Sequence, residues 1–318
     1  PLVEALRTLG ARIEYIGQEG FPPLRILPPG DELGNQYKLH IPANISSQFI
    51  SALLMVGPVL PRGIEVKLEG KLVSASYLQM TLDMMNDFDI DYTFHEQIIR
   101  IPPQKYRGHT YRVESDWSAA SYHYANAALA KDVDLHLRGL LPKSMQGDAA
   151  TTELFGRLGL QTTWESDGLR ITRSGAPASM LEHDFLLCPD IAQTMAVVLA
   201  GLGVPGLFTG LETLSIKETD RIAALRDELI KVSVAFSQMP NRFSPRTGKT
   251  YYMLEGKAHW EETPTFATYH DHRMAMAFAP LSLIAPVRIE DPKVVGKSYP
   301  DFWKDLTKLG WTVQLVDG

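Results

Sequence analysis

PDIAQTMAVVLAGLGVPGLFTGLETLSIKETDRIAALRDEL, residues 189–229, predicts two helices with a strand between them. Residues 189–204 are an apolar run rich in Ala and Val, which is typical of a buried helix. The β-rich segment GLFTGLETL follows at 206–214. The second helix is expected to begin at Ser215, because Ser215 and Glu218 have the spacing of a capping box.

The same succession recurs along the chain about every 70 to 80 residues, which indicates a repeated unit of helix, strand, helix and strand. The first helix of each unit is rich in Ala and Met or other apolar residues, and the expected starts are Ser46, Ser115, Pro189 and His270. The second helix is amphipathic and leads into an alternating strand, at residues 2–16, 77–94, 151–164 and 302–315. In three of these segments Gly10, Gly159 and Gly310 stand where a left-handed helix C-cap is expected.

A domain boundary is expected near Val113, where an extended run gives way to the helix start ESDWSAAS. We therefore expect two domains, residues 1–113 and 114–318. Residues 2–16 supply only the second half of a unit, so the first domain is expected to be incomplete and the chain to begin partway through the fold.

Composition excludes several classes of function. The 318 residues carry a formal net charge of -6, which argues against a nucleic-acid or membrane partner held by bulk attraction. The single cysteine, Cys188, excludes an internal disulfide and a multi-cysteine zinc site. The sequence shows no paired histidine ligands, GxxxxGK[ST] loop or GxGxxG fingerprint, and no leader or membrane span. We expect a cytoplasmic monomer without a metal or cofactor.

Several cations are expected at helix starts. Lys217 and Arg221 lie near the start of one helix, and Arg273 follows the expected N-cap Asp271 of another. Lys297 precedes a third helix. Cations at these positions oppose the helix macrodipole, so an anion bound there would explain them. The alternative for KETDR is a solvated surface helix with a Glu218 to Arg221 pair.

Each remaining candidate also has a structural interpretation. Ser46, Ser47 and Ser74 offer hydroxyls at helix starts, where serine is most often an N-cap. Asp190 is either an N-cap or a catalytic base. His272 is either a site residue or a helix-start histidine bonded to the backbone, and Cys188 is interpreted as a buried small hydrophobe.

Five runs resemble the hallmark motifs of the 3-phosphoshikimate 1-carboxyvinyltransferases, the EPSP synthases: SSQF (46–49), SMQGD (144–148), KETDR (217–221), DHRMAM (271–276) and GKSYPDF (296–302). The similarity covers the whole chain. It implies an α/β (α+β) protein with the enolpyruvyl transferase fold, in which two similar domains built from βαβαββ units each form an inside-out α/β barrel.

The resemblance also implies a reaction. The enolpyruvyl group of phosphoenolpyruvate passes to the 5-hydroxyl of shikimate 3-phosphate, in aromatic amino acid biosynthesis. Binding of shikimate 3-phosphate is implied for Ser46, Ser47, Gln48, Ser74, Asp190 and Lys217. Binding of phosphoenolpyruvate is implied for Gln48, Arg221, Arg273, Lys297 and His272. The catalytic residues implied are Asp190, Glu218 and Lys217.

The sequence departs from the family at Ala75 and Ser76, where a residue followed by proline is usual, and at Thr213, where many members have asparagine. The family's first segment, with its glycine-rich motif for phosphoenolpyruvate, is also missing. The chain alone is therefore expected to be nearly inactive.

Three other functions remain open. They are a UDP-N-acetylglucosamine enolpyruvyl transferase of the same fold, an inactive anion-binding fragment, and an RNA-end-processing relative, which the acidic balance disfavours. The main hypothesis requires Lys217, Arg221, Arg273 and Lys297 to lie together.

Overall fold

The computed structural model describes residues 1–43, 47–70, 75–240, 242 and 248–316, and its contacts divide the chain into residues 1–113 (unit 1) and 114–318 (unit 2). Each unit has hydrophobic core residues of its own. Among the described residues, no helix is both long enough and apolar enough to cross a membrane.

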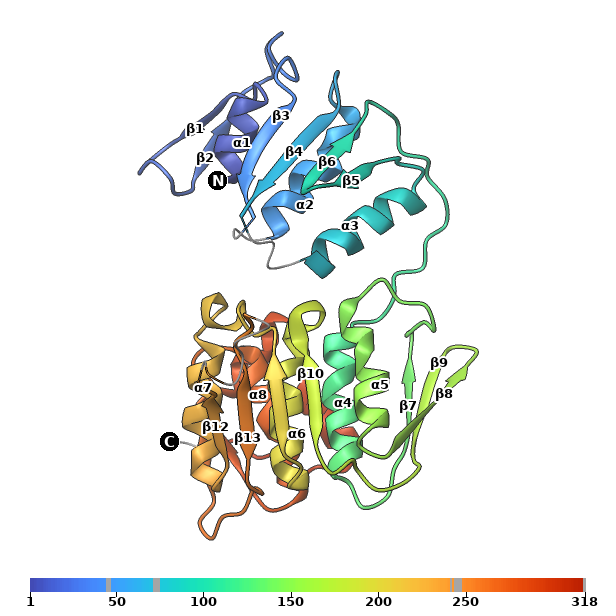
Figure 1. Cartoon of the computed structure of the whole chain (residues 1–318), viewed down its shortest axis with the longest axis vertical. Helices are drawn as coiled ribbons and strands as arrows, with labels where there is room; N and C mark the ends of the chain where they lie inside the picture. Colours follow the sequence, from blue (N-terminus) through green and yellow to red (C-terminus); the bar gives the residue numbers. More distant parts are fainter. Residues whose placement is uncertain (44–46, 71–74, 241, 243–247, 317–318) are drawn as a thin grey trace. The chain divides into compact units, whose positions relative to one another are not determined.

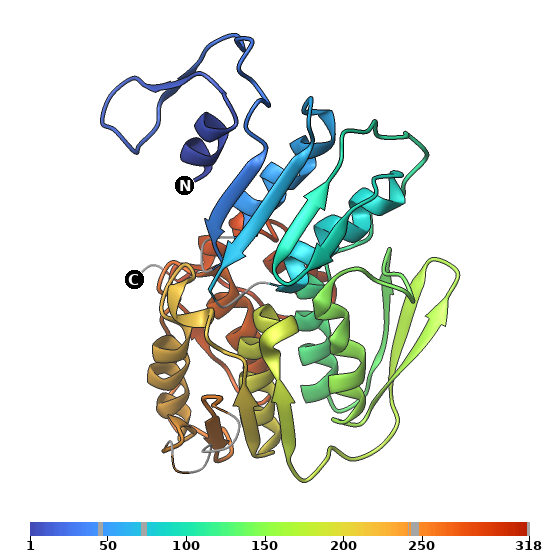
Figure 2. The same cartoon turned by 45° about the horizontal axis from the view of Figure 1, so that its top comes forward.

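Unit 1 consists of a small hairpin and a four-stranded sheet in the order β3-β4-β6-β5. Strands β3 and β4 are parallel, and the other neighbours are antiparallel. Buried and exposed residues alternate along β3, so one face of the sheet is covered, and α2 and α3 lie against it (Figure 1, Figure 2). The elements are α1 (Leu2–Thr8), β1 (Ile13–Tyr15), β2 (Leu24–Ile26), β3 (Lys38–Pro42), α2 (Ser47–Val56), β4 (Ile64–Glu69), α3 (Ala75–Asp87), β5 (Thr93–His95) and β6 (Ile98–Ile101).

Unit 2 contains a sheet with the same topology as the sheet of unit 1. Its order is β10-β11-β13-β12, with β10 and β11 parallel and the other neighbours antiparallel. The βαβαββ unit implied by the sequence therefore occurs in each part of the chain. The elements of this sheet and its helices are β10 (Leu181–Asp184), α6 (Ala192–Leu202), β11 (Gly206–Thr209), α7 (Arg221–Leu229), β12 (Ala235–Gln238) and β13 (Tyr252–Glu255).

The other two repeats of unit 2 are less regular. One has an antiparallel sheet in the order β7-β9-β8, and the other has only the parallel pair β14-β15. The strand expected after the last helix is wrong, because Trp311 turns back onto that helix and its indole donates to Ser282. The elements are α4 (Trp117–Leu129), β7 (Asp134–Arg138), α5 (Thr151–Gly156), β8 (Leu160–Glu165), β9 (Gly168–Arg173), β14 (Thr265–Phe266), α8 (His272–Phe278), β15 (Arg288–Ile289) and α9 (Phe302–Lys308).

Helices α4, α6 and α8 contact one another in the interior of unit 2. Residues Ala192 to Gly201 of α6 are all buried, and most of α4 and α8 is buried as well. A helix that is apolar on every side requires this environment, and the many alanines allow the helices to approach closely. The four apolar helices predicted from the sequence are therefore confirmed, each beginning within three residues of the expected start.

Two of the glycines predicted to end helices show why that residue is needed. Gly10 and Gly159 have φ angles of 93° and 84°, and a side chain on either would collide with a backbone oxygen. Gly310 also has a positive φ, so the helix ends predicted at these three glycines are confirmed.

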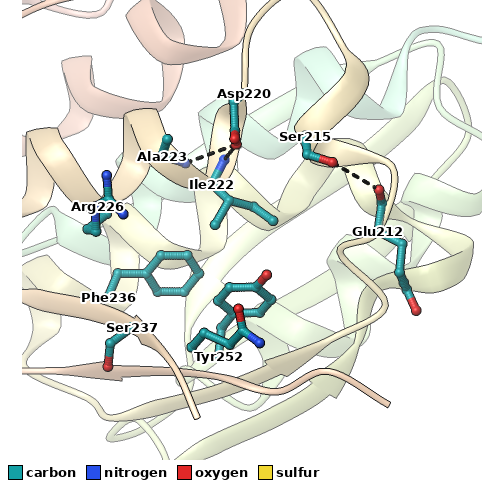
Figure 3. A pocket seen from close by; sticks show the side chains of 10 residues that line it. Glu212, Ser215, Asp220, Ile222, Ala223, Arg226, Phe236, Ser237 and Tyr252 are labelled. Atoms are coloured by element: carbon teal, nitrogen blue, oxygen red, sulfur yellow. Dashed lines mark hydrogen bonds between the residues drawn. The ribbon is translucent and has the colours of Figure 1, made fainter. Parts of the chain in front are cut away.

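A hollow of about 450 Å³ lies beside α7 (Figure 3). The rings of Phe236 and Tyr252 stack in its wall, with centroids 5.6 Å apart. Asp220 and Ile222 line the hollow, but Arg221 between them does not. The start of α7 thus presents Asp220 and Ile222 to this hollow and the Arg221 side chain elsewhere.

Candidate active site

The helix in the KETDR segment begins later than the sequence predicts. Asp220 is the N-cap, and its carboxylate accepts hydrogen bonds from the amides of Ile222 and Ala223, each at 3.1 Å. The predicted start at Ser215 is wrong, since the Ser215 hydroxyl donates to the carbonyl of Glu212 instead. A carboxylate directly before the helical run is a better placed cap, so Lys217 and Glu218 lie in the segment before α7.

Arg221, the first residue of α7, is the buried centre of the site. Its side chain is 1% exposed. The guanidinium donates to Asp271 at 2.7 Å, to Asp190 at 2.9 Å and to Glu218 at 2.8 Å. The Glu218 to Arg221 pair is present, but the interpretation of this segment as a solvated surface helix is wrong, because three carboxylates take the place of water around Arg221.

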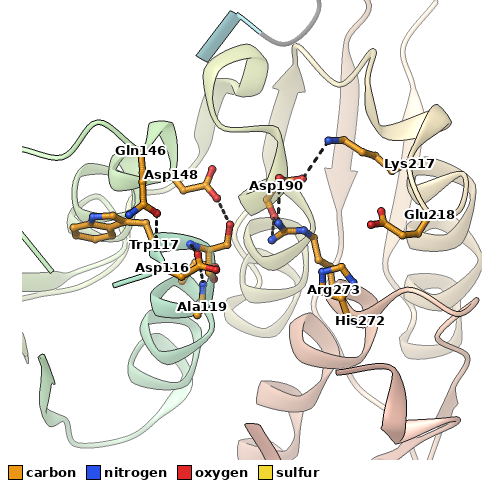
Figure 4. A network of polar contacts seen from close by, with 12 residues as sticks. Asp116, Trp117, Ala119, Gln146, Asp148, Asp190, Lys217, Glu218, His272 and Arg273 are labelled. Carbon is orange, nitrogen blue, oxygen red and sulfur yellow. Dashed lines mark hydrogen bonds and ion pairs between the residues drawn. The ribbon is translucent and has the colours of Figure 1, made fainter. Parts of the chain in front are cut away.

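Asp190 binds three cations of the site. It belongs to a 3₁₀ turn before α6 and makes no capping bond there, so its interpretation as an N-cap is wrong. Its oxygens lie 2.9 Å from Arg221, 3.1 Å from Arg273 and 3.8 Å from Lys217. Figure 4 shows Lys217 and Arg273 directed at this carboxylate from two sides.

Glu218 lies between Arg221 and Lys297, with which it forms a short ion pair. Burial raises the pKa of Glu218, but the Lys297 hydrogen bond, its own backbone amide and the charge of Arg221 outweigh that effect and lower it to about 2. In this arrangement Glu218 is a carboxylate at neutral pH.

Helix α8 contributes Asp271, His272 and Arg273. Asp271 accepts a hydrogen bond from the amide of Arg273 at 2.9 Å, so the prediction that Asp271 is the N-cap is confirmed. Burial lowers the pKa of His272, and the charge of Arg273 adds to that effect. Nδ1 of His272 is buried and has no hydrogen-bond partner among the described residues, so the neutral ring does not bond to the backbone through this atom.

Sequence reasoning missed two buried residues near this network. The hydroxyl of Tyr122 in α4 lies 3.3 Å from Arg273, and Tyr122 is 1% exposed. Asp148, the last residue of SMQGD, is buried and accepts a hydrogen bond from Ser118. Burial and the nearby charge of Asp190 raise the pKa of Asp148 to about 6. The motif drew attention to Asp148, but local sequence could not reveal its burial.

The serine candidates belong to unit 1. Ser47 is the first residue of α2, and Gln48 follows it with an exposed side chain. Ser46 and Ser74 lie outside the described residues.

Cys188 is buried beside Asp190, and burial raises the pKa of its thiol to about 12. A thiol that stays protonated at neutral pH is not a nucleophile, which agrees with its interpretation as a small hydrophobe.

A possible metal-binding group lies apart from this network in sequence and shares no residue with it. His136, Glu165 and Asp167 offer ligand atoms within 4.8 Å of one another on the sheet of β7, β8 and β9. Asp167 also pairs with Arg138 at 3.2 Å, so a cation bound there would meet a competing positive charge.

The four cations required by the hypothesis do lie together. Contacts run from Lys217 through Asp190 to Arg221 and Arg273, and from Arg221 through Glu218 to Lys297. Four cations face the three carboxylates Asp190, Glu218 and Asp271, which leaves one net positive charge. The network can therefore attract an anion and also holds carboxylates that can exchange protons.

Comparison with known proteins gives the same family as the motifs. Residues 1–306 match the family model described as EPSP synthase (3-phosphoshikimate 1-carboxyvinyltransferase). A 3-phosphoshikimate 1-carboxyvinyltransferase of Bacteroides fragilis is 44% identical over 316 residues, which cover 99% of this chain and 75% of the relative. The enzyme of that name from Syntrophobacter fumaroxidans is 36% identical, over 97% of this chain and 70% of its own length.

Solved structures support the fold. The structure of an EPSP synthase from Acinetobacter baumannii matches with a TM-score of 0.76 at 22% identity, over 99% of this chain and 71% of that one. The fold class predicted from the sequence is confirmed. The family model and the relatives together show that this chain belongs to the EPSP synthase (3-phosphoshikimate 1-carboxyvinyltransferase) family.

Proposed function

We propose that this chain takes part in the transfer of the enolpyruvyl group from phosphoenolpyruvate to the 5-hydroxyl of shikimate 3-phosphate, a step of aromatic amino acid biosynthesis. The observation that carries the proposal is the network in which Lys217, Arg221, Arg273 and Lys297 are interleaved with Asp190 and Glu218. Both substrates are phosphorylated anions, and bringing them together requires fixed positive charge.

Phosphoenolpyruvate is assigned to the side of the network formed by Arg273 and Lys297. Arg273 is 14% exposed and Lys297 is 56% exposed, so both cations can reach a ligand. Arg221, at 1% exposure, is enclosed by its three carboxylates. The contribution of Arg221 is therefore to fix the positions of Asp190 and Glu218 and to add positive potential. His272 is proposed to lie beside the bound phosphoenolpyruvate.

The reaction adds the 5-hydroxyl oxygen to C2 of phosphoenolpyruvate while a proton reaches C3, and phosphate then leaves as C3 gives up a proton. Asp190 is the proposed acceptor of the hydroxyl proton, and Lys217, 3.8 Å away, can bind the phosphate of shikimate 3-phosphate or relay the proton. Three cations near Asp190 would hold its carboxylate in position to act as that acceptor.

Glu218 is the proposed proton donor to C3. With its pKa at about 2 it cannot donate at neutral pH while it is paired with Lys297. A phosphate or carboxylate group of phosphoenolpyruvate that takes over Lys297 removes the largest influence lowering that pKa. Binding of the anion thus prepares Glu218 to carry a proton.

Unit 1 is proposed to supply the remaining contacts to shikimate 3-phosphate, through Ser46, Ser47 and Ser74, with Gln48 between the two ligands. Residues 1–113 are then the phosphoshikimate domain, and residues 114–318 are the domain that holds phosphoenolpyruvate and the catalytic carboxylates. We propose that the protein acts as a cytoplasmic monomer without a nucleic-acid or membrane partner, consistent with its net charge of -6. Light scattering of the purified chain tests whether it is a monomer.

Thermal-shift and calorimetric titrations test the substrates. Shikimate 3-phosphate should stabilise the chain and UDP-N-acetylglucosamine should not, since a ligand at 100 times its Kd adds about 2.7 kcal/mol to the unfolding free energy. Lys297→Met should weaken binding of phosphoenolpyruvate and leave shikimate 3-phosphate unaffected. Lys304→Met, at an exposed lysine of α9, is the matched control. Stabilisation by the UDP sugar alone, or equal effects of the two lysine variants, would contradict the proposal.

A further inference from the structure

The segment that carries Lys297 is tied to the interior of unit 2 by a tyrosine two residues later. The amide of Tyr299 donates to the carbonyl of Val295 at 2.8 Å, so Lys297 lies inside a closed backbone turn. Val295 is 3% exposed and packs with Phe302 and Leu306. One side of the turn is therefore buried, whereas the Lys297 side chain is 56% exposed.

The hydroxyl of Tyr299 lies between two partners from different helices. It donates to Asp305 of α9 at 2.9 Å, and Nε2 of His123 in α4 is 3.0 Å from the same oxygen. A phenol has one hydrogen to donate, and Tyr299 donates it to the carboxylate of Asp305. Nε2 of His123 must therefore be the protonated nitrogen that donates to Tyr299.

The surroundings of His123 fit this assignment. His123 is 8% exposed, and its Nδ1 is buried without a hydrogen-bond partner among the described residues. A bare Nδ1 is the acceptor that remains when Nε2 carries the hydrogen, whereas a second hydrogen there would be a buried donor without an acceptor. Burial lowers the pKa of His123, which agrees with a neutral ring.

Helix α4 contacts Arg273 directly and the turn that carries Lys297 through Tyr299. Tyr122 lies 3.3 Å from Arg273 and packs edge to face on Phe302, and the next residue, His123, contacts Tyr299. Two adjacent side chains of one buried helix thus reach the Arg273 guanidinium and the turn of Lys297.

We propose that Tyr299 is a positioning residue, which by bridging His123 and Asp305 holds the turn of Lys297 so that its ammonium is presented to Glu218 and to the anion that replaces Glu218. The inference rests on the proposed function for the identity of that anion. The presentation of Lys297 to Glu218 does not depend on it.

The first test measures Lys297 without any ligand. The chain is treated with an amine-reactive ester at neutral pH, and mass spectrometry gives the labelling of Lys297 relative to Lys304. Glu218→Gln sets the rate for an unpaired Lys297. Tyr299→Phe, which keeps the ring and removes the hydroxyl, should raise the ratio about three- to tenfold, the equivalent of one lost hydrogen bond. His123→Leu should act in the same direction.

Tyr124→Phe is the matched control. Tyr124 belongs to α4, as His123 does, and its hydroxyl is hydrogen-bonded to Thr162 of β8 at 2.7 Å. Tyr124→Phe therefore removes a comparable tyrosine hydrogen bond that does not involve the turn of Lys297. If Tyr299→Phe and Tyr124→Phe give the wild-type labelling ratio while Glu218→Gln raises it, the inference is wrong. A purely structural role for Tyr299 predicts equal losses of stability in both variants and no change at Lys297.

The second test is calorimetric binding of phosphoenolpyruvate. Tyr299→Phe should raise its Kd about three- to tenfold, while Tyr124→Phe leaves it unchanged. If Lys297→Met weakens binding and Tyr299→Phe does not, the inference fails and the proposed function stands. If Lys297→Met has no effect, the assignment of the anion fails, and the labelling ratio still decides whether Tyr299 positions Lys297.

Discussion

Replacing Arg221 with methionine should destabilise unit 2 severely. Methionine is about as long as the aliphatic stem of arginine and carries no charge. It therefore fills the space of that stem while removing the hydrogen-bond donors of the guanidinium group. Of the three carboxylates bound to Arg221, Glu218 keeps Lys297 and Asp190 keeps Arg273. Asp271 is fully buried and loses both of its guanidinium hydrogen bonds, so it bears most of the cost.

The expected loss is about 3–5 kcal/mol, the usual cost of removing one partner of a buried ion pair. This is a large part of the roughly 5–15 kcal/mol that stabilises a typical domain. For a domain of this size it corresponds to a fall in Tm of about 6–20 °C. Asp271→Asn in the same background should recover part of the loss, because asparagine can still cap α8 and carries no charge.

Urea unfolding and calorimetry measure the effect, with Arg226→Met as the control. Arg226 lies on the same helix, but its side chain is 62% exposed and pairs only with Asp227 in the described contacts. That substitution should change stability by less than about 0.5 kcal/mol. A loss below about 1 kcal/mol in Arg221→Met would refute the view that Arg221 compensates buried carboxylates.

Three further outcomes are expected. Glu218 has a folded pKa of about 2 against an ordinary 4.5, so its contribution to stability is present above pH 4.5 and is lost as pH falls toward 2. In Lys297→Met the unfolding free energy should fall less steeply over this pH range, as unfolding curves would measure. Asp148 has a folded pKa of about 6 against 3.8, so its contribution is full below pH 3.8 and is lost as pH rises through 6; Asp148→Asn should therefore gain about 1–3 kcal/mol over the wild type between pH 4 and 7, and equal pH profiles would contradict this. Cys188 should resist iodoacetamide in the native chain at pH 8 and react after unfolding, and rapid native labelling would show that its thiol is accessible.

The sequence predicted local features of the site well and its long-range contacts poorly. The N-cap Asp271 follows from one residue type at one position. The pairing of that same residue with Arg221, fifty positions away, follows from packing that local patterns do not describe. The error at Ser215 has a comparable origin, because two capping signals lie five residues apart and the sequence alone does not rank Asp220 above Ser215.

The repeat pattern predicted the architecture because its signals are redundant across copies. Apolar helices and terminal glycines recur, so one weak copy does not change the result. The strand expected after α9 was predicted wrongly because the last repeat has no long strand with which it could pair. Its strands β14 and β15 each comprise only two residues. The roles of Ser47 and Gln48 remain predictions, because ligand contacts are not encoded in a helix start.

The starts of α4, α6 and α8 lie side by side in Figure 4, with Asp190 in the turn directly before α6 and Arg273 in the first turn of α8. A helix enclosed along its whole length cannot tilt without disturbing both neighbours. Bulkier residues in the middle of these helices, for example at Ala196 of α6, would therefore move the reacting groups without touching a ligand. The small size of the buried alanines at the centre of unit 2 thus bears on where Asp190 and Arg273 are held.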